Sequence, residues 1–127
     1  MIARILVVDD DAAFRTSMRT FLESRHHQVL EASDGSQAFV LAEQEVPHII
    51  IMDIVMPGLY GSAASKKLQE YWRTSHIPII ILSGASHEPV RRLIETNPNI
   101  RFLKKPVDLG ALDEAIHALL PQGGILP

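Results

Sequence analysis

The sequence contains no cysteine, and this absence excludes disulfide bonds, zinc sites built from thiolates and catalysis by a thiol. It also fits a reducing cytoplasm, where we expect the protein to be located. No uninterrupted apolar run approaches the roughly 18 residues of a membrane-spanning helix, and the N-terminus lacks the long apolar stretch of a secretory signal. We therefore expect neither export nor association with a membrane.

The chain is not basic, since 12 Lys and Arg residues stand against 15 Asp and Glu residues, a formal net charge of −3. Nucleic-acid-binding domains normally carry a basic excess, so we expect no direct binding to DNA or RNA. The 127 residues, of which 46% are apolar and 21% charged, suit one globular domain. We place this domain at residues 1–120 and interpret residues 121–127 as a tail or the start of a linker.

Short apolar runs rich in Ile and Val are spaced regularly along the chain. There are five of them, at residues 5–8, 29–30, 49–52, 79–82 and 100–103. Three of the runs are continuously apolar rather than alternating, which is typical of strands buried on both faces of a parallel sheet.

Between these runs, apolar residues recur at helical spacing. The apolar stripes of five predicted helices fall at residues 14–22, 38–42, 64–72, 90–94 and 112–120. Asp11 and Asp108 are candidate N-caps of the first and the last helix, and Ser36 is a candidate start of the second. The alternation predicts an α/β fold, a doubly wound, five-stranded parallel sheet with five helices on its two faces.

Polar side chains follow four of the five apolar runs, at the carboxyl ends where open parallel sheets form their sites. These side chains are Asp9, Asp10 and Asp11, then Asp53, then Ser83, and finally Lys104 and Lys105. If the four strands are neighbours, the groups converge on one pocket. Oxygen ligands without His or Cys favour a hard cation such as Mg²⁺. An aspartate beside Mg²⁺ can accept a phosphoryl group, whose charge a lysine and a serine hydroxyl can stabilise.

Several polar residues have simpler interpretations than a place in this pocket. Asp11 is expected to cap a helix rather than to bind a metal. Lys104 is expected to point away from Lys105, because side chains alternate along a strand. Asp34 and Gly35 are explained by a turn. The six histidines are scattered, without metal-ligand spacing, and are expected at the surface.

Four segments resemble the receiver domain of bacterial two-component response regulators: ILVVDDD at the start, DIVMPGLYG from Asp53, ILSG around Ser83 and FLKKP ending at Pro106. EASDG at residues 31–35 resembles the second strand and turn of that family. The spacings also fit, with 44 residues from Asp9 to Asp53, 30 from there to Ser83 and 22 more to Lys105. The resemblance covers about residues 2–120 and implies a flavodoxin-like fold with the strand order 2-1-3-4-5.

The resemblance implies a role for each matching residue of the pocket. Asp53 would be the phosphoacceptor. Asp9 and Asp10 would hold Mg²⁺, Asp10 directly and Asp9 partly through water, and the backbone carbonyl of Val55 would be a further ligand. Lys105 would pair with the phosphoryl group.

Further implied roles concern the transmission of the signal. Ser83 fills the family's Ser/Thr switch position and Phe102 its aromatic switch position, while the Lys105–Pro106 bond is expected to be cis. Phe102 departs from the tyrosine that often stands there, so it has the ring but no hydroxyl.

The expected function is that of a phosphorylation-controlled switch. A sensor histidine kinase or phosphotransfer protein would phosphorylate Asp53, and a face at about residues 88–120 would then bind a downstream protein or output domain. The resemblance also allows a phosphorylation-dependent homodimer. The chain would catalyse only its own phosphorylation and dephosphorylation, so we do not expect an enzyme with a diffusible substrate.

Two alternatives belong to other functional classes. One is a small phosphatase of the haloacid dehalogenase type, because Asp9 and Asp11 are spaced like its paired acids. Its further motifs are missing: no Thr follows the pair and no acidic pair follows the fourth strand. The other is a binding module that signals independently of phosphate, against which the intact acids argue.

Overall fold

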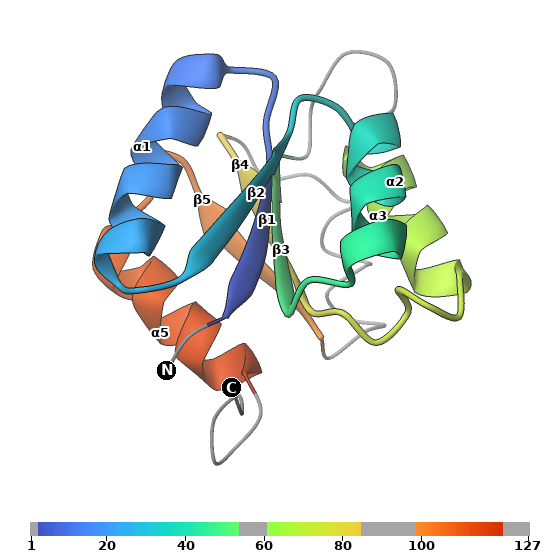
Figure 1. Ribbon diagram of the computed structural model, residues 1–127. Helices are drawn as coiled ribbons and strands as arrows, with labels where there is room; N and C mark the ends of the chain where they lie inside the picture. Colours follow the sequence, from blue (N-terminus) through green and yellow to red (C-terminus); the bar gives the residue numbers. More distant parts are fainter. Residues whose placement is uncertain (1–2, 54–60, 85–98, 121–127) are drawn as a thin grey trace.

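The computed structural model describes residues 3–53, 61–84 and 99–120. In these ranges strands and helices alternate along the chain (Figure 1). Their bounds are β1 (Arg4–Val8), α1 (Ala12–Ser24), β2 (Gln28–Ala32), α2 (Gly35–Glu45), β3 (Ile49–Asp53), α3 (Gly61–Glu70), β4 (Ile79–Ser83), β5 (Ile100–Lys104) and α5 (Leu109–Leu119). The fourth predicted helix, near residues 90–94, and the tail at 121–127 lie outside the described residues.

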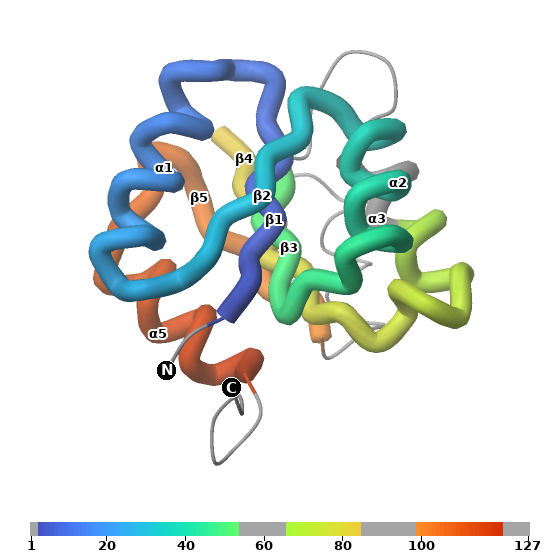
Figure 2. The backbone as a smooth tube through the Cα atoms, viewed as in Figure 1, coloured from blue at the N-terminus to red at the C-terminus, as the bar shows by residue number. Residues whose placement is uncertain are grey.

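The five strands form one sheet in the order β2-β1-β3-β4-β5, and every neighbouring pair is parallel (Figure 2). This confirms the predicted doubly wound sheet and its strand order. The carboxyl ends of all five strands therefore lie along the same edge of the sheet. Residues that follow the central strands meet there, however far apart they are in the sequence.

Two apolar clusters pack on opposite faces of the sheet, as Figure 1 shows for the helices that cover them. One lies under α2 and α3 and contains Leu6, Ile50 and Ile81, while the other lies under α1 and α5 and contains their strand neighbours Ile5, Ile51 and Ile80. Successive residues of a strand point to opposite faces. The apolar residues of a strand in the middle of this sheet are consequently buried on whichever face they lie, which explains the continuous apolar runs.

Aspartate side chains fix where three of the helices begin. Asp11 and Asp108 accept hydrogen bonds from backbone N–H groups in the first turns of α1 and α5, as predicted. Asp34, which the sequence assigned to a turn, caps α2 by accepting from the N–H of Gln37, so this helix begins at Gly35 rather than at Ser36. No helix in the described ranges is both long and apolar enough to cross a bilayer.

Two histidines at the amino end of β1 are not at the surface, which corrects the expectation for them. His27 is buried and its Nδ1 accepts a hydrogen bond of 3.1 Å from the N–H of Ala3. Half-buried His48 accepts one of 2.9 Å from the N–H of Arg4. Burial lowers the pKa of both rings, helped by the positive charge of the N-terminus at His27 and of Arg4 at His48. Each ring thus accepts the hydrogen bond from its backbone N–H group only while its Nδ1 has no proton.

These depressed pKa values predict a loss of stability in mild acid. The unfolded chain binds protons near the ordinary histidine pKa of about 6.5, whereas the folded chain binds them only at lower pH. The stabilisation is therefore fully present above about pH 6.5 and is lost as the pH falls toward the folded pKa values. We expect the free energy of unfolding, measured in urea, to fall between pH 7 and pH 5 because of these two rings.

The double variant His27→Asn/His48→Asn tests this dependence, because an amide oxygen can accept the same N–H groups without titrating. Its stability should change less between pH 7 and pH 5 than that of the wild type. The control is His76→Gln, since His76 is exposed, and it should keep the wild-type pH dependence. If the free energy of unfolding of the double variant fell as much between pH 7 and pH 5 as that of the wild type, the role assigned to His27 and His48 would be contradicted.

Candidate functional site

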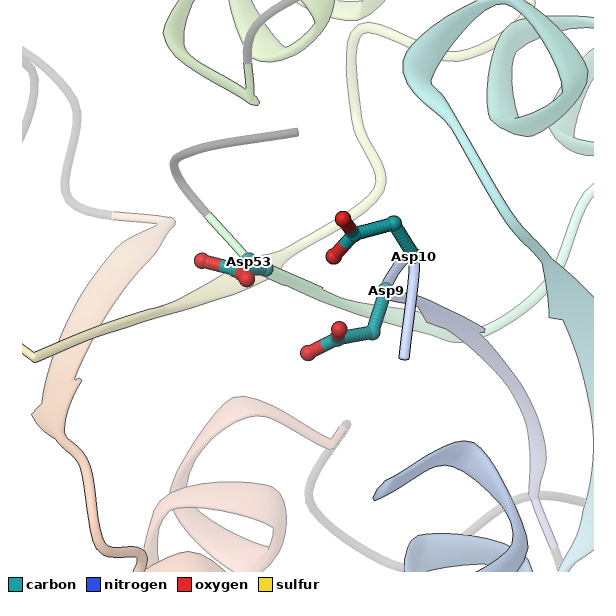
Figure 3. A group of neighbouring side chains, drawn as sticks. All are labelled: Asp9, Asp10 and Asp53. Carbon is teal, nitrogen blue, oxygen red and sulfur yellow. The ribbon is translucent and has the colours of Figure 1, made fainter. Parts of the chain in front are cut away.

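Three acidic side chains meet at the carboxyl ends of two neighbouring strands. Asp9 and Asp10 follow β1, Asp53 ends β3, and the two strands pair in parallel. Figure 3 shows the three side chains beside one another, and one carboxylate oxygen from each lies within 4.8 Å of the others. The Asp9 side chain is 1% exposed and that of Asp53 14%, whereas Asp10 is exposed. The pocket is thus buried at its base and open to solvent at Asp10.

Asp9 is held by both its backbone and its side chain. Its N–H donates to the carbonyl of Ala32 at 3.1 Å, and its own carbonyl accepts from Nη1 of Arg15 at 2.6 Å. One carboxylate oxygen accepts from the N–H of Asp11 at 2.9 Å, and the other faces Lys105. Arg15 is itself anchored by an ion pair of 3.0 Å with Glu31. A buried acid with this many partners has a fixed position in the pocket.

Lys105 is the cation of the pocket. Its Nζ lies 2.9 Å from Asp9 Oδ2 and 3.3 Å from Asp53 Oδ2. It also lies 4.3 Å from the centre of the Phe14 ring. Burial alone would lower the pKa of this ammonium group, but the hydrogen bonds and charges of the two carboxylates outweigh burial and raise the pKa. The peptide bond from Lys105 to Pro106 is cis.

The charges of the pocket do not balance. Three carboxylates and one ammonium group leave a formal charge of 1 − 3 = −2. Two unit charges at this separation repel by about 3 kcal/mol at an effective dielectric constant near 20. A divalent cation would neutralise the excess, and a ligand set made only of carboxylate oxygens suits a hard ion such as Mg²⁺. Asp9, Asp10 and Asp53 are the described residues that could hold it.

The other site residues expected from the sequence lie around this pocket or outside the described part. Ser83 ends β4, its side chain is buried, and its carbonyl accepts a 2.8 Å hydrogen bond from the N–H of Lys105. Phe102 lies within β5 and packs against the apolar cluster under α2 and α3. Lys104 is exposed. Val55 falls among residues 54–60, outside the described residues.

Sequence reasoning did not place two residues near the pocket. The sequence pattern places Phe14 only on the apolar face of the first helix and indicates no role for Arg15. Both stand in the first turn of α1, directly after the acidic triplet. Their closeness to the acidic triplet in the sequence could have indicated this position. A helix that begins at the edge of a site places the side chains of its first turn along that edge.

The strand order and the acidic pocket at the carboxyl ends of the strands are those of the receiver class of signalling domains. The family model described as "Response regulator receiver domain" matches residues 5–117. The chain therefore belongs to the receiver domains of two-component response regulators.

Individual proteins agree with this assignment. The chain is 40% identical over 118 residues to Protein PilH of Pseudomonas aeruginosa, covering 93% of this chain and 98% of PilH. It spans only 15% to 24% of three longer curated relatives. Chemotaxis protein CheY4 of Vibrio cholerae shares the fold, with a TM-score of 0.85, 23% identity and coverage of 94% of this chain and 100% of CheY4.

A third similar protein is the receiver domain of sensor histidine kinase PA1611 from Pseudomonas aeruginosa. It has a TM-score of 0.83 and 26% identity, and the match covers 94% of this chain and 98% of that one. Its structure is described as having a magnesium ion coordinated in the active-site cleft.

The charge balance of the pocket predicts how variants change stability in the absence of divalent ions. Lys105→Met keeps most of the apolar stem but removes the ammonium group that forms ion pairs with both Asp9 and Asp53. The free energy of unfolding, measured in urea with EDTA present, should fall by about 1–2 kcal/mol. Adding Asp53→Asn to this variant should recover part of the loss, because one of the repelling charges is removed.

Lys104→Met is the matched control, since Lys104 is the neighbouring lysine and is exposed. It should leave the stability within about 0.5 kcal/mol of the wild type. A similar loss in both lysine variants, or no recovery from Asp53→Asn, would be incompatible with the charge balance described above.

Proposed function

We propose that this chain is a phosphorylation-controlled switch in which Asp53 accepts the phosphoryl group. The observation that carries this proposal is the position of Lys105, whose ammonium group bridges Asp9 and Asp53 within a cluster of three carboxylates. A carboxylate that is partly accessible, beside a fixed cation and two further acids, has the surroundings that a phosphoacceptor needs.

In the proposed reaction, a carboxylate oxygen of Asp53 attacks the phosphorus atom of the donor and forms a new P–O bond. The bond from phosphorus to the leaving atom breaks, and its electron pair stays with the donor. That atom is nitrogen in a phosphohistidine and oxygen in acetyl phosphate. Lys105 already contacts Asp53 and stabilises the negative charge on the transferred group.

Mg²⁺ is the proposed cofactor, held by Asp9, Asp10 and Asp53 and by the backbone carbonyl of Val55. Bound there, it would offset the repulsion among the acids and the charge of the phosphoryl oxygens. The coordinated magnesium ion of the PA1611 receiver domain supports this choice of metal. Buried Asp9 keeps its place through its own protein contacts, and exposed Asp10 faces solvent.

The switch is proposed to act through Ser83 and Phe102. The Ser83 hydroxyl would turn toward a phosphoryl oxygen on Asp53, and the Phe102 ring would move into the space that is released. The 2.8 Å hydrogen bond between the Ser83 carbonyl and the Lys105 N–H joins the ends of β4 and β5. A change at β4 therefore has a direct route into β5 and α5, within the proposed output face at about residues 88–120.

A sensor histidine kinase or phosphotransfer protein is the proposed phosphoryl donor, and a downstream protein or an output domain is the proposed receiver of the signal. Relatives that contain kinases support the first part, among them the CAI-1 autoinducer sensor kinase/phosphatase CqsS of Vibrio cholerae. A cytoplasmic location and a phosphorylation-dependent homodimer belong to the same proposal. The chain would act on no substrate other than its own acceptor.

The two alternatives receive no support from the structure. The phosphatase alternative needs Asp11 in the pocket, but its Oδ1 accepts from the N–H groups of Ala13 and Phe14 and so caps α1. A binding module that signals independently of phosphate would not require the cluster of Asp9, Asp10 and Asp53 around one lysine.

Incubation with acetyl phosphate and Mg²⁺ tests the acceptor directly. Intact-protein mass spectrometry should show an increase of about 80 Da, the mass of one phosphoryl group. Asp53→Asn should abolish the increase, since its amide oxygen is a far weaker nucleophile, and excess EDTA should also suppress it. No increase in the wild type, or an equal one in Asp53→Asn, would refute the proposed function.

The switch predicts a difference between Ser83→Ala and Ser75→Ala. Hydrogen exchange in β5 and α5 should change when the wild type is treated with beryllofluoride and Mg²⁺. Ser83→Ala should bind beryllofluoride but show a smaller change, because the hydroxyl that responds to the group is gone. Ser75→Ala, at an exposed serine, should respond as the wild type does. Equal responses in all three proteins would argue against Ser83.

A further inference from the structure

Lys105 has a third neighbour besides the two carboxylates, the aromatic ring of Phe14. The ammonium nitrogen lies 4.3 Å from the ring centre, well within the range of a cation–π interaction. Phe14 is on α1 and Lys105 follows β5, so 91 residues (105 − 14) separate them in the sequence. The two residues are therefore brought together by the fold and not by closeness in the sequence.

The position of Phe14 is tied to the acids of the pocket. Its N–H donates to Asp11 Oδ1 at 3.3 Å, and the N–H of Asp11 donates to Asp9 Oδ1 at 2.9 Å. Asp9 Oδ2 in turn accepts from Lys105. These contacts thus link Phe14, Asp11, Asp9 and Lys105 in sequence, and the contact between Lys105 and the Phe14 ring closes the loop. The ring itself is partly buried and packs against the apolar cluster under α1 and α5.

Lysine has a long flexible stem, and fixing it costs side-chain entropy. The Lys105 side chain is 27% exposed, so solvent competes for its ammonium group. A ring face attracts the cation without neutralising it, which leaves the full charge available to a phosphoryl group. A third carboxylate in the same place would hold the lysine but would repel that group.

We propose that Phe14 is a positioning residue, whose ring holds the Lys105 ammonium group over the acceptor carboxylate of Asp53 and thereby speeds acceptance of the phosphoryl group. This inference rests on the proposed function for its consequence, while the contact itself is independent of it. Phe14 does not touch the reacting atoms and acts only through the lysine.

The contact has a spectroscopic signature that needs neither metal nor phosphoryl donor. Protons near a ring face are shifted upfield, so the ε-methylene and ammonium protons of Lys105 should resonate upfield of those of Lys104. Phe14→Leu should abolish this shift. Phe21→Leu is the matched control, because Phe21 is also on α1 but has Arg25 over its ring instead. An unchanged Lys105 spectrum in Phe14→Leu would overturn the contact.

The rate of phosphorylation by acetyl phosphate tests the consequence. Phe14→Leu should slow phosphorylation by about two- to tenfold. This range corresponds to the loss of a single cation–π contact that is exposed or partly desolvated. Phe14→Tyr keeps the ring and should retain the wild-type rate. Replacing Phe14 by phenylalanines with one, two and three ring fluorines should slow the reaction stepwise, because fluorine weakens the attraction to a cation with little change in shape.

A merely structural role for Phe14 would give another pattern. The fluorinated series would then keep one rate, and Phe14→Leu would slow the reaction as much in a Lys105→Met background as in the wild type. Either result overturns the proposal, which expects no further effect of Phe14→Leu once Lys105 is absent. A wild type that takes up no phosphoryl group would refute the proposed function. Normal uptake by Phe14→Leu, with the spectral shift lost, would refute this inference alone.

Discussion

The ammonium group of Lys105 is the one group in the described residues whose ion pairs join three separate parts of the pocket, namely the ends of β1, β3 and β5. In the sheet, β5 is separated from β3 by β4, and neighbouring strands lie about 4.8 Å apart. Only a long side chain can extend from the end of β5 to the end of β3. Its ammonium group has a defined position only if the backbone of Lys105 is fixed. The hydrogen bond from the Lys105 N–H to the Ser83 carbonyl fixes it. The pocket therefore depends on the sheet register as much as on its own charges.

The sheet has opposite chemistry at its two ends. At the amino end of β1, Nδ1 of His27 and of His48 accepts a hydrogen bond from a backbone N–H group, and burial lowers the pKa of both rings. At the carboxyl end, Asp9, Asp10, Asp53 and Lys105 form a pocket that is buried at Asp9 and open to solvent at Asp10. Between them, the strand interiors are buried on both faces by apolar side chains. An apolar layer thus separates the amino end, where the two histidines pair with the backbone, from the carboxyl end, where the acidic pocket lies.

The sequence predicted the sheet because each determinant is local. Continuous runs such as Ile49–Met52 can be buried on both faces only in a parallel sheet, and an aspartate before a helical stripe, such as Asp11, marks a helix start. The meeting of Asp9, Asp10 and Asp53 followed from strand ends that share one edge. Other features depended on contacts that no pattern encodes. His27 is buried because its ring accepts from Ala3, 24 residues away, and Phe14 reaches Lys105 only through the packing of α1 beside β5. In a sequence, neither differs from an ordinary surface or core residue.

The charge of the pocket accounts for how the proposed switch would work. With a formal charge of −2 the acids favour a divalent cation, and with that cation bound the charge is near zero. In the proposed switch, a phosphoryl group on Asp53 would bring about two negative charges while the carboxylate loses its own, so the pocket would gain about one negative charge at the point where Lys105 already lies. The ammonium group of Lys105 would consequently be drawn from Asp9 toward the new charge. The Ser83 hydroxyl, at the end of β4, is the proposed second partner of the phosphoryl group. Because Phe14 holds the lysine without neutralising it, the resting state already has the cation close to its new partner. The proposed rearrangement would therefore be small, and the hydrogen bond between the Ser83 carbonyl and the Lys105 N–H would transmit it to β5 and α5.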